Sequence, residues 1–474
     1  MLEIKLVNKN KQGQIFGDKD LLSLIREHFS APNPSFRRNA RFTASRLYSI
    51  TPQGKFKIGL YEEIKLFCIN NQILLKTEES FLKKINIGLH NSSVEYLNKD
   101  YRPYQLESIK KSLFSGRGVI VIPTAGGKTL IMAGLIKSFL KNKPNLKKIL
   151  VIVPTLQLVH QTAEDFYSYG LDKVSKWCGD SPYDQNSLIT VAGSQILMSA
   201  KTDLSVLSEV DLLLMDEVHQ AKRGNQINEV LKFIETDYRF GFTGTLPSTK
   251  IDVWNIIGEF GPVLYEEKTI TLKEKSFVSE FKVIILNIIH KNLPKIKIDT
   301  SSPVSGYQEE LDFLMKNSRR NEIITNLALK LKENTLIMVD RIDHGDLLFD
   351  FLSKHTTNTG RPVYFIQGET EIADREHIRS LMEQRRDVIV VAISKIFSTG
   401  INIPNLHNII FASIGKAKIK IMQSIGRVLR LHHTKSIATI FDIADNTHYG
   451  KKHVEERKKL YKLEKYEYSE KEIT

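Results

Sequence analysis

The sequence predicts an α/β protein in which two domains built on parallel sheets follow a small N-terminal α+β domain. Short apolar strand candidates alternate with helical patterns from Val119 to Thr245, as they do in a parallel sheet with crossover helices. The alternation starts again after Gly261-Pro262, which indicates a second domain of the same kind. At 474 residues the chain is too long for one ordinary core, and a length prior suggests about three domains.

The composition is that of a globular protein with a polyanionic partner. Hydrophobic residues make up 41% and charged residues 26%, which excludes a disordered or fibrous chain. The 68 Lys and Arg against 54 Asp and Glu leave a net charge of +14, which favours nucleic acid, although lysines that merely solvate the surface would give the same balance.

Cysteine use and hydropathy bear on the compartment. Cys68 and Cys178 form neither a metal-ligand spacing nor a disulfide framework, which fits a reducing cytoplasm. The N-terminus lacks the apolar segment of a signal peptide, and no stretch approaches the roughly 20 apolar residues of a membrane span. A soluble, unsecreted, cytoplasmic protein is expected.

Residues 1–95 are predicted to form the α+β domain, with a strand at Ile4–Val7 and a helix at Leu21–Phe29. Between residues 36 and 42 positive charges alternate with aromatic rings, a pattern suited to phosphates and exposed bases. A basic hairpin whose aromatics belong to the core is the alternative. The predicted nucleic-acid contacts are Arg37, Arg38, Arg41 and Phe42.

A phosphate-binding loop is predicted between the strand Val119–Ile122 and the helical segment that starts near Leu130. Thr124, Gly126 and Gly127 lie in this loop, where small residues let backbone N–H groups turn towards phosphates. Lys128 supplies a point charge, and Thr129 can offer its hydroxyl to Mg²⁺. Ile122 stands where the usual pattern has glycine, so a Gly-rich turn that happens to precede Lys-Thr is the alternative.

Arg102-Pro-Tyr-Gln105 precedes the helical pattern of residues 106–114. The Gln105 amide can donate to and accept from an adenine edge, and Tyr104 can stack on the base. The same residues can also be a plain helix start.

A second chemical motif follows the apolar segment Val210–Met215. Asp216 can hold Mg²⁺ through water, Glu217 can polarise the attacking water, and His219 would couple the site to neighbouring elements. A solvated loop is the alternative. Downstream, a short strand ends in Thr243, Gly244 and Thr245, which suit a relay between the nucleotide and a second domain.

The second half has strand candidates at Thr335–Val339, Pro362–Ile366, Asp387–Ala392 and Ile409–Phe411 but no second phosphate loop. Gln423, Arg427 and Arg430 recur at helical spacing. Arginines aimed at a phosphate on another domain stabilise the transition state, and a salt-bridged helix face is the alternative.

Residues 451–474 are predicted to form a charged, solvated C-terminal helix, with a DNA-contacting appendage as the other possibility.

In order, these motifs resemble the series found in superfamily 2 helicases. They are Arg102-x-Tyr-Gln105, Pro123 to Thr129, Val153-Pro-Thr-Leu156, Asp216-Glu-Val-His219, Thr243-Gly-Thr245, Ser398-Thr-Gly-Ile-Asn402 and Gln423-x-x-Gly-Arg-x-x-Arg430. The resemblance covers about residues 96–445. It implies two RecA-like domains, at 96–265 and 266–450, with ATP in the cleft between them.

The resemblance also implies residue roles. Lys128 and Thr129 contact phosphate and Mg²⁺, Asp216 and Glu217 serve metal and water, and Arg427 and Arg430 act as arginine fingers, with Gln423 in a coupling role. Gly400 and Asn402 belong to the nucleotide-binding set, although many helicases have Asp in place of Asn402. The nucleic-acid backbone is held by Pro154, Thr155, Ser194 and Gln195.

Closer similarity is to the bacteriophage UvsW-type branch-migration helicases, through Phe397-Ser-Thr-Gly400, Ile421 to Arg430 and the region Asn39–Phe42. It implies an ATP- and Mg²⁺-dependent enzyme that unwinds or migrates DNA forks, D-loops and four-way junctions in recombination, repair or replication. Branched and single-stranded DNA are the implied partners, beside recombination or single-strand-binding proteins, and a monomer in the host cytoplasm is expected. The alternatives are an RNA helicase, a restriction-type translocase and a non-motor strand-annealing protein.

Overall fold

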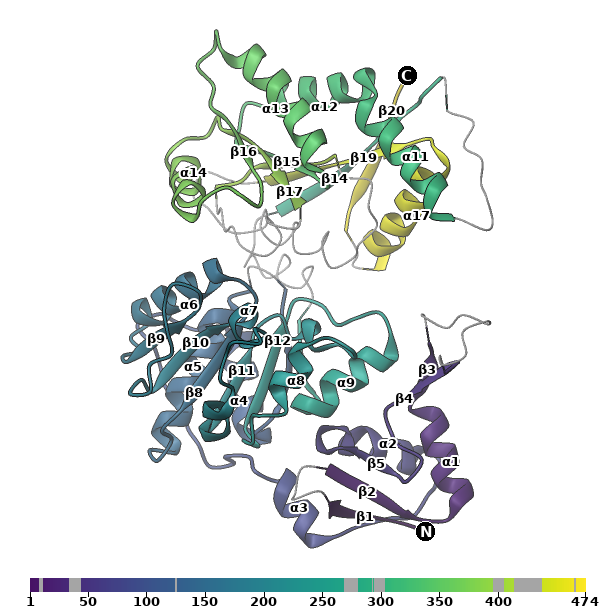
Figure 1. Cartoon of the computed structure of the whole chain (residues 1–474), viewed down its shortest axis with the longest axis vertical. Coiled ribbons are helices and arrows are strands. Elements are labelled where there is room, and N and C mark those ends of the chain that lie inside the picture. The colour runs from purple at the N-terminus through teal and green to yellow at the C-terminus, as the bar shows by residue number, and fades with distance from the viewer. Residues whose placement is uncertain are drawn as a thin grey trace. The chain divides into compact units, whose positions relative to one another are not determined.

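The computed structural model describes residues 1–7, 12–33, 44–123, 126–267, 280–291, 293, 303–394, 405–412, 437–463 and 466–474. The chain divides into two compact units, the first of residues 1–122 and 127–267 and the second of residues 268–474 with 123–126 (Figure 1). The fold class is confirmed: the units hold two parallel sheets, and a small mixed sheet precedes them. The finer domain boundaries, after residues 95, 265 and 450, stay predictions.

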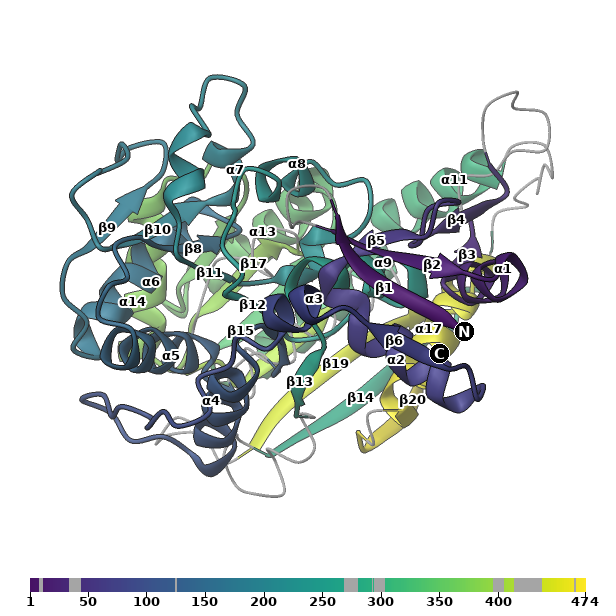
Figure 2. The ribbon, with the colours of Figure 1, turned by 90° about the horizontal axis from the view of Figure 1, so that it is seen from below.

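The N-terminal sheet has the strand order β5-β2-β1-β6. Its strands are β1 (Leu2–Val7), β2 (Gln12–Gly17), β5 (Lys55–Lys57) and β6 (Leu75–Thr77), and Figure 2 shows β1, β2 and β5 side by side. Helices α1 (Lys19–His28), α2 (Tyr61–Asn70) and α3 (Glu79–Ile85) complete this region. Two further strands, β3 (Ser30–Pro32) and β4 (Arg46–Tyr48), pair with each other as an antiparallel ribbon, called here the β3–β4 ribbon.

The first unit contains a seven-stranded sheet of order β13-β7-β12-β11-β8-β10-β9, in which every pairing is parallel. The strands are β7 (Gly118–Val121), β8 (Ile149–Val153), β9 (Val174–Trp177), β10 (Ile189–Gly193), β11 (Leu212–Met215), β12 (Arg239–Thr243) and β13 (Val263–Glu266). Its helices are α4 (Pro103–Ser115), α5 (Lys128–Asn142), α6 (Leu156–Ser168), α7 (Ser194–Leu197), α8 (Ile227–Leu231) and α9 (Lys250–Phe260), with short 3-10 helices η1 (Ile58–Leu60), η2 (Ser205–Glu209) and η3 (Val218–Ala221).

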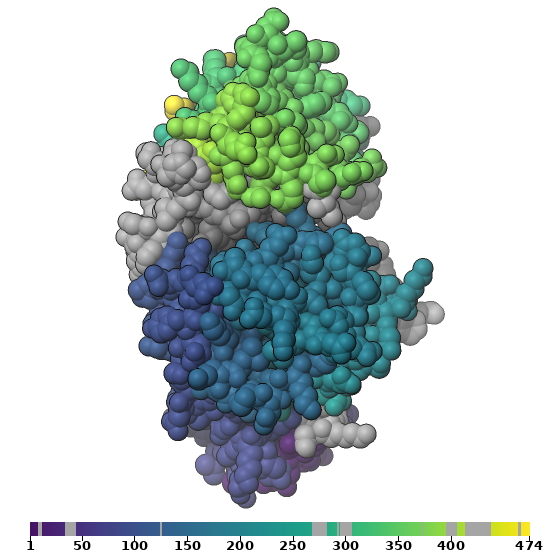
Figure 3. All heavy atoms as spheres, turned by 90° about the vertical axis from the view of Figure 1, so that its left-hand side faces the viewer, coloured from purple at the N-terminus to yellow at the C-terminus, as the bar shows by residue number. Residues whose placement is uncertain are grey.

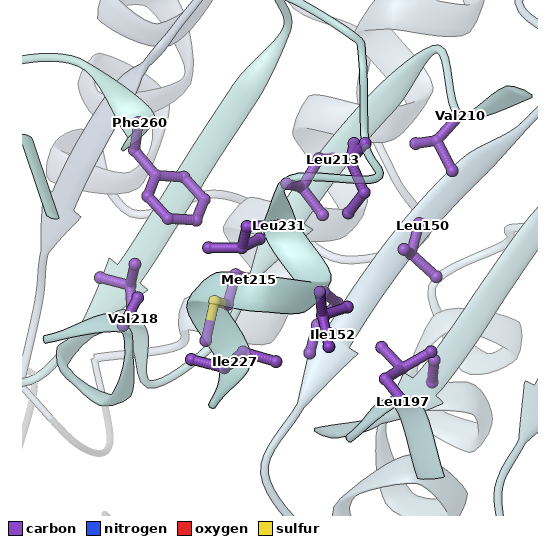
Figure 4. Close-up of a cluster of buried hydrophobic side chains, with 14 of the residues drawn as sticks. Leu150, Ile152, Leu197, Val210, Leu213, Met215, Val218, Ile227, Leu231 and Phe260 are labelled. Carbon is purple, nitrogen blue, oxygen red and sulfur yellow. The ribbon is translucent and has the colours of Figure 1, made fainter. Parts of the chain in front are cut away.

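The apolar runs seen in the sequence form the core of this sheet. Leu150 and Ile152 of β8 and Leu213 and Met215 of β11 point to one face, where Phe260 of α9 packs with them (Figure 4). The strand residues between them are buried as well. Burial on both faces explains why these strands read as continuous apolar runs.

The second unit has the strand order β16-β17-β15-β18-β19-β14-β20, again with parallel pairings. The predicted strands are present as β15 (Thr335–Val339), β16 (Val363–Ile366), β17 (Ile389–Ile393) and β18 (Asn408–Phe411). Strands β14 (Glu280–Ile288), β19 (Ile437–Asp445) and β20 (Tyr468–Ile473) were not predicted. The helices are α11 (Pro303–Lys316), α12 (Ser318–Lys330), α13 (Ile342–Thr356), α14 (Ile372–Gln384) and α17 (His448–Leu463).

The prediction of a charged, solvated helix over residues 451–474 is right for one face of α17, where Lys451, Lys452 and Glu455 are exposed, and wrong for the opposite face and for the last residues of the chain. Helix α17 buries one face, where Arg457 is 4% exposed and Tyr461 fully buried. Arg457 pairs with Asp442 of β19 at 2.7 Å, and the Tyr461 hydroxyl donates to the same carboxylate. The chain then ends in β20, which pairs with β14. Charge alone indicated solvent, whereas the buried carboxylate of Asp442 supplies a partner that lets the charged helix dock.

The N-terminal region and the first parallel sheet share a hydrophobic core, called here the seam. Ile251, Trp254 and Ile257 of α9 pack with the buried residues of the N-terminal sheet and helices. At the seam η1 lies so close to α9 that a Cβ at Gly59 would collide with the carbonyl oxygen of Ile257. In Figure 3 the slate and purple N-terminal residues lie against the blue residues of the following sheet.

Ion pairs flank the seam. Lys57 Nζ lies 2.6 Å from Glu259 of α9, and Lys84 Nζ lies 2.5 Å from Asp237, just before β12.

Among the residues that the structure describes, no helix is both long and apolar enough to cross a membrane.

Candidate nucleotide and nucleic-acid site

The predicted phosphate loop follows β7 and leads directly into α5. Gly127 precedes the helix with φ +78°, a left-handed conformation that glycine adopts without steric cost, and the Gly126 N–H donates to the Pro123 carbonyl at 3.0 Å. Lys128 is the first residue of α5, and Thr129 follows it in the first turn. Thr124 lies outside the described residues.

Lys128 points towards the acidic motif at the end of β11. Its side chain is 9% exposed, and Nζ lies 3.9 Å from Glu217 Oε1 and 3.5 Å from the Ile122 carbonyl oxygen. A buried ammonium with few protein partners is suited to an anionic ligand, because the ligand's charge offsets the cost of desolvating the ammonium.

Asp216 and Glu217 follow β11, as predicted, and their backbone is held firmly. The Asp216 N–H donates to the Ile152 carbonyl of β8, and the Glu217 N–H donates to Asp216 Oδ1, both at 2.9 Å. Glu217 has φ +48°, a conformation that is uncommon for a residue with a side chain and recurs at functional sites.

The Asp216 carboxyl titrates abnormally. Burial, followed by the adjacent charge of Glu217, raises the pKa of Asp216 to about 6, although Lys128 opposes the shift. Two neighbouring carboxylates in a buried setting favour a bound cation, which would restore the ionised form. Asp216 with the hydroxyl of Thr129 offers the oxygen ligands that Mg²⁺ prefers.

His219 joins the acidic motif to the end of β12. Its Nδ1 lies 3.2 Å from Glu217 Oε2 and 3.0 Å from Thr243 Oγ1. The Thr243 hydroxyl in turn donates to the Thr245 carbonyl at 2.9 Å, across Gly244. These contacts connect the acidic motif to the end of β12, and the coupling role of His219, Thr243, Gly244 and Thr245 stays a prediction.

Gln105 lies beside the phosphate loop. Its Oε1 accepts from the Arg102 N–H at 2.8 Å, and a Cβ at Gly127 would collide with its Nε2. Arg102 Nη1 donates to the Tyr104 hydroxyl at 3.2 Å. The Tyr104 ring is only 2% exposed, so a base could stack on it only after the ring is uncovered.

The predicted nucleic-acid residues of this unit lie at the ends of β8 and β10. Thr155 accepts from the Leu158 N–H at 3.3 Å and so caps α6. The buried Ser194 hydroxyl donates to the Pro154 carbonyl at 3.2 Å, while Gln195 is exposed. Because parallel strands end at one edge of a sheet, these residues share that edge with Lys128 and Asp216.

Several predicted site residues lie outside the described residues. They are Arg37, Arg38, Arg41 and Phe42 between β3 and β4, and Gly400, Asn402, Gln423, Arg427 and Arg430 in the second unit.

A polar cluster that the sequence analysis did not predict lies at the carboxyl end of β9. His160, Cys178 and Asp180 bring potential metal ligands within 4.8 Å of one another. Lys176 Nζ lies 3.2 Å from His160 Nδ1, and His160 Nε2 lies 3.1 Å from Asp180. Burial raises the pKa of the Cys178 thiol. The Cys178 thiol also donates to Asp180 Oδ1 at 3.1 Å, so the four side chains form one hydrogen-bond network.

Comparisons with known proteins agree with this geometry. Residues 98–248 match the family described as "Type III restriction enzyme, res subunit", and residues 318–432 match "Helicase conserved C-terminal domain". A DNA 3'-5' translocase XPB2 of Sulfurisphaera tokodaii is 24% identical over 78% of this chain and 86% of its own. The solved fragment of a putative HsdR subunit of a type I restriction enzyme from Vibrio vulnificus YJ016 has the same fold, with a TM-score of 0.61 and 16% sequence identity. The match covers 99% of this chain and 80% of the HsdR fragment.

A nearer relative is the ATP-dependent DNA helicase uvsW of Enterobacteria phage T4, which is 31% identical over 463 residues, or 93% of this chain and 90% of its own. Identity at this level over almost the whole of both chains extends beyond the motor motifs into the N-terminal region. The chain therefore belongs to the superfamily 2 helicases and is an ATP-dependent DNA helicase of the UvsW type.

Proposed function

We propose that this helicase couples ATP hydrolysis to the unwinding and branch migration of forked, D-loop and four-way junction DNA in recombination, repair or replication. The observation that supports the proposal is the shared edge of the first parallel sheet. The ends of β7, β11 and β12 bring Lys128, Glu217 and Thr243 together there, and the neighbouring ends of β8 and β10 present the predicted backbone-contacting residues.

Each residue at this edge has a proposed task. Lys128 and the backbone of Gly126 and Gly127 bind the phosphates of ATP, and Thr129 with Asp216 holds Mg²⁺. When bound, Mg²⁺ neutralises phosphate charge and orients the γ-phosphate. Glu217 accepts a proton from the attacking water, and His219 holds the Glu217 carboxylate in place at 3.2 Å.

The second half completes the site in this proposal. Arg427 and Arg430 stabilise the charge that develops on the γ-phosphate, Gln423 has a coupling role, and Gly400 and Asn402 contact the nucleotide. Arg37, Arg38, Arg41 and Phe42 hold DNA outside the motor by phosphate contacts and base stacking.

The test is ATP-dependent resolution of a synthetic four-way DNA junction beside a simple duplex of the same length, with the wild-type protein and the Lys128→Ala and Glu217→Gln variants. Both variants should lose turnover, and Glu217→Gln should retain ATP binding because Lys128 and the loop are intact. Junction resolution that continues without ATP hydrolysis would refute the motor assignment. A matched RNA junction decides between DNA and RNA, since equal stimulation by both would contradict a DNA-specific enzyme.

A further inference from the structure

Helix η3, which follows the acidic motif, and helix α9, which follows β12, both lead to contacts with the N-terminal region. Helix η3 begins one residue after Glu217 and ends at Ala221, and α9 begins seven residues after Thr243. The apolar face of α9 forms the seam with the N-terminal core. A continuous series of contacts therefore connects the hydrolysis residues to the N-terminal sheet.

Asn255 of α9 connects three of these elements through one side-chain amide. Its Nδ2 donates to the Ala221 carbonyl at 2.8 Å and to Asn228 Oδ1 at 2.9 Å, and its Oδ1 accepts from Lys57 Nζ at 2.9 Å. Ala221 is fully buried. Because both amide hydrogens and the oxygen have partners, the end of η3 and β5 of the N-terminal sheet are held in one arrangement.

Arg223 makes a second connection, to the β3–β4 ribbon. Its Nη1 donates to the Tyr48 carbonyl at the end of β4 at 2.7 Å, and its backbone N–H donates to Asp252 Oδ1 of α9 at 3.0 Å. The Tyr48 ring is itself fixed, because the Arg26 guanidinium stacks on it at 3.6 Å. The ribbon whose connecting segment contains residues 36–42 is thus bonded to a residue six positions after Glu217.

At its other end η3 has no room to move independently of the sheet. Val218 is fully buried, and a Cβ at Gly241 of β12 would lie 2.7 Å from Val218 Cγ2. Glu217, which precedes η3, already has a left-handed backbone. A displacement of Ala221 would therefore reach the Glu217 carboxylate through the packed backbone of η3.

We propose that Asn255 and Arg223 are positioning residues that transmit DNA binding at the β3–β4 ribbon to the hydrolysis loop that carries Glu217. The inference rests on the proposed DNA contacts of residues 36–42. The proposed coupling acts between DNA binding and ATP turnover, so it is measured as the ratio of kcat with and without DNA. Asn255 and Arg223 contact neither ligand, so their loss uncouples the two sites and leaves each of them intact.

The experiment measures ATPase activity of the full chain at increasing concentrations of a forked DNA, which separates kcat without DNA, kcat at saturating DNA and the DNA concentration for half stimulation. Asn255→Asp keeps the acceptor for Lys57 but removes the donor to Ala221. Arg223→Met keeps the chain length and removes the donor to Tyr48. Lys84→Met is the matched control, because it breaks an N-terminal ion pair on Asp237, at the opposite, amino end of β12.

Asn255→Asp and Arg223→Met should each lower the stimulation by DNA about 5- to 10-fold, while kcat without DNA and DNA affinity without nucleotide stay at wild-type values. Lys84→Met should keep full stimulation. A purely structural role would instead lower basal turnover and thermal stability together in the two test variants, and that result overturns the proposal. Arg223 is exposed, so its variant keeps the test decisive if Asn255→Asp folds poorly.

Failure of the inference and failure of the proposed DNA contacts give different results. Wild-type stimulation in both Asn255→Asp and Arg223→Met overturns the relay, whatever the N-terminal variants do. Unchanged DNA affinity in an Arg37→Ala, Arg41→Ala double variant overturns the DNA contacts of residues 36–42, and with them the relay's starting point at the ribbon.

Discussion

Replacing Trp254 by alanine should loosen the N-terminal sheet and its helices from the first parallel sheet without unfolding either. The Trp254 side chain is 8% exposed, and its ring centroid lies 5.1 Å from that of Phe29 and 6.1 Å from that of His28. It belongs to α9 but packs into the core of the N-terminal domain. Its removal therefore opens a cavity at the seam.

The expected cost follows from that burial. Truncation of a buried Trp to Ala costs about 3–5 kcal/mol, which includes the lost transfer free energy and the cavity left behind. The aromatic pairs with Phe29 and His28 account for about 0.5–1.5 kcal/mol each beyond area burial. Trp254→Phe keeps most of the apolar contact, so its loss of stability at the seam should be less than half of that in Trp254→Ala.

Hydrogen exchange followed by mass spectrometry measures this loss locally, because it reports the opening free energy of each segment. Peptides from α1 and α2 should exchange faster in Trp254→Ala by the factor that corresponds to about 3–5 kcal/mol, while peptides from β8 and β11 keep wild-type protection. If the opening free energy of α1 and α2 changes by less than about 1 kcal/mol, the conclusion that Trp254 stabilises the seam is refuted. Equal acceleration in β8 would also contradict it, since the damage would then be global.

Four further outcomes are expected. Gly127→Ala should lower ATPase activity at least tenfold, because the φ of +78° and the neighbouring Gln105 amide leave no room for a Cβ. Steady-state turnover at saturating ATP measures this effect, and normal turnover would contradict the loop geometry. Arg320→Met should lower the free energy of unfolding by about 3–5 kcal/mol, since it leaves the buried Asp445 carboxylate without the guanidinium 2.9 Å away. Urea unfolding, followed by a signal from the second unit, measures this free energy. Burial alone would raise the pKa of Asp445, but Arg320 and a neighbouring histidine hold that pKa below the usual value of an aspartate. The stability that this carboxylate contributes is therefore present above its unfolded pKa of about 4 and is lost as the pH falls through the lower folded pKa. Arg320→Met should reduce this pH dependence, which unfolding midpoints between pH 3 and 7 can follow. Tyr461→Phe should destabilise the docking of α17 by about 1.5–3 kcal/mol, read as faster exchange of α17 peptides, and unchanged protection there would contradict the role of its hydroxyl.

The local pattern of the chain predicted strands β7, β11 and β12 of the first parallel sheet and β15, β16, β17 and β18 of the second. Val119–Ile122 is apolar throughout, and Thr335–Val339 is apolar after its first residue, because both faces of an interior parallel strand are buried; β7 and β15 lie where these segments predicted them. The strands that were missed in the second unit carry charges. Strand β20 at the sheet edge includes Glu470 and Lys471, so its pairing with β14 leaves no apolar run in the sequence.

What the sequence by itself determined was the identity of the chemical groups and their order, from Gln105 through Lys128 to Asp216 and Glu217, because each group stands next to the strand or helix that presents it. The tertiary structure decided what lies beside them: Lys128 reaches Glu217, and His219 reaches Thr243, because a parallel sheet gathers the ends of strands that are distant in the chain. Only the tertiary structure showed that Asn255 and Arg223 tie the hydrolysis loop to the N-terminal domain. The two bonds cited accept at the backbone carbonyl groups of Ala221 and Tyr48, and because every residue has such a carbonyl, no local pattern of side chains could have predicted them.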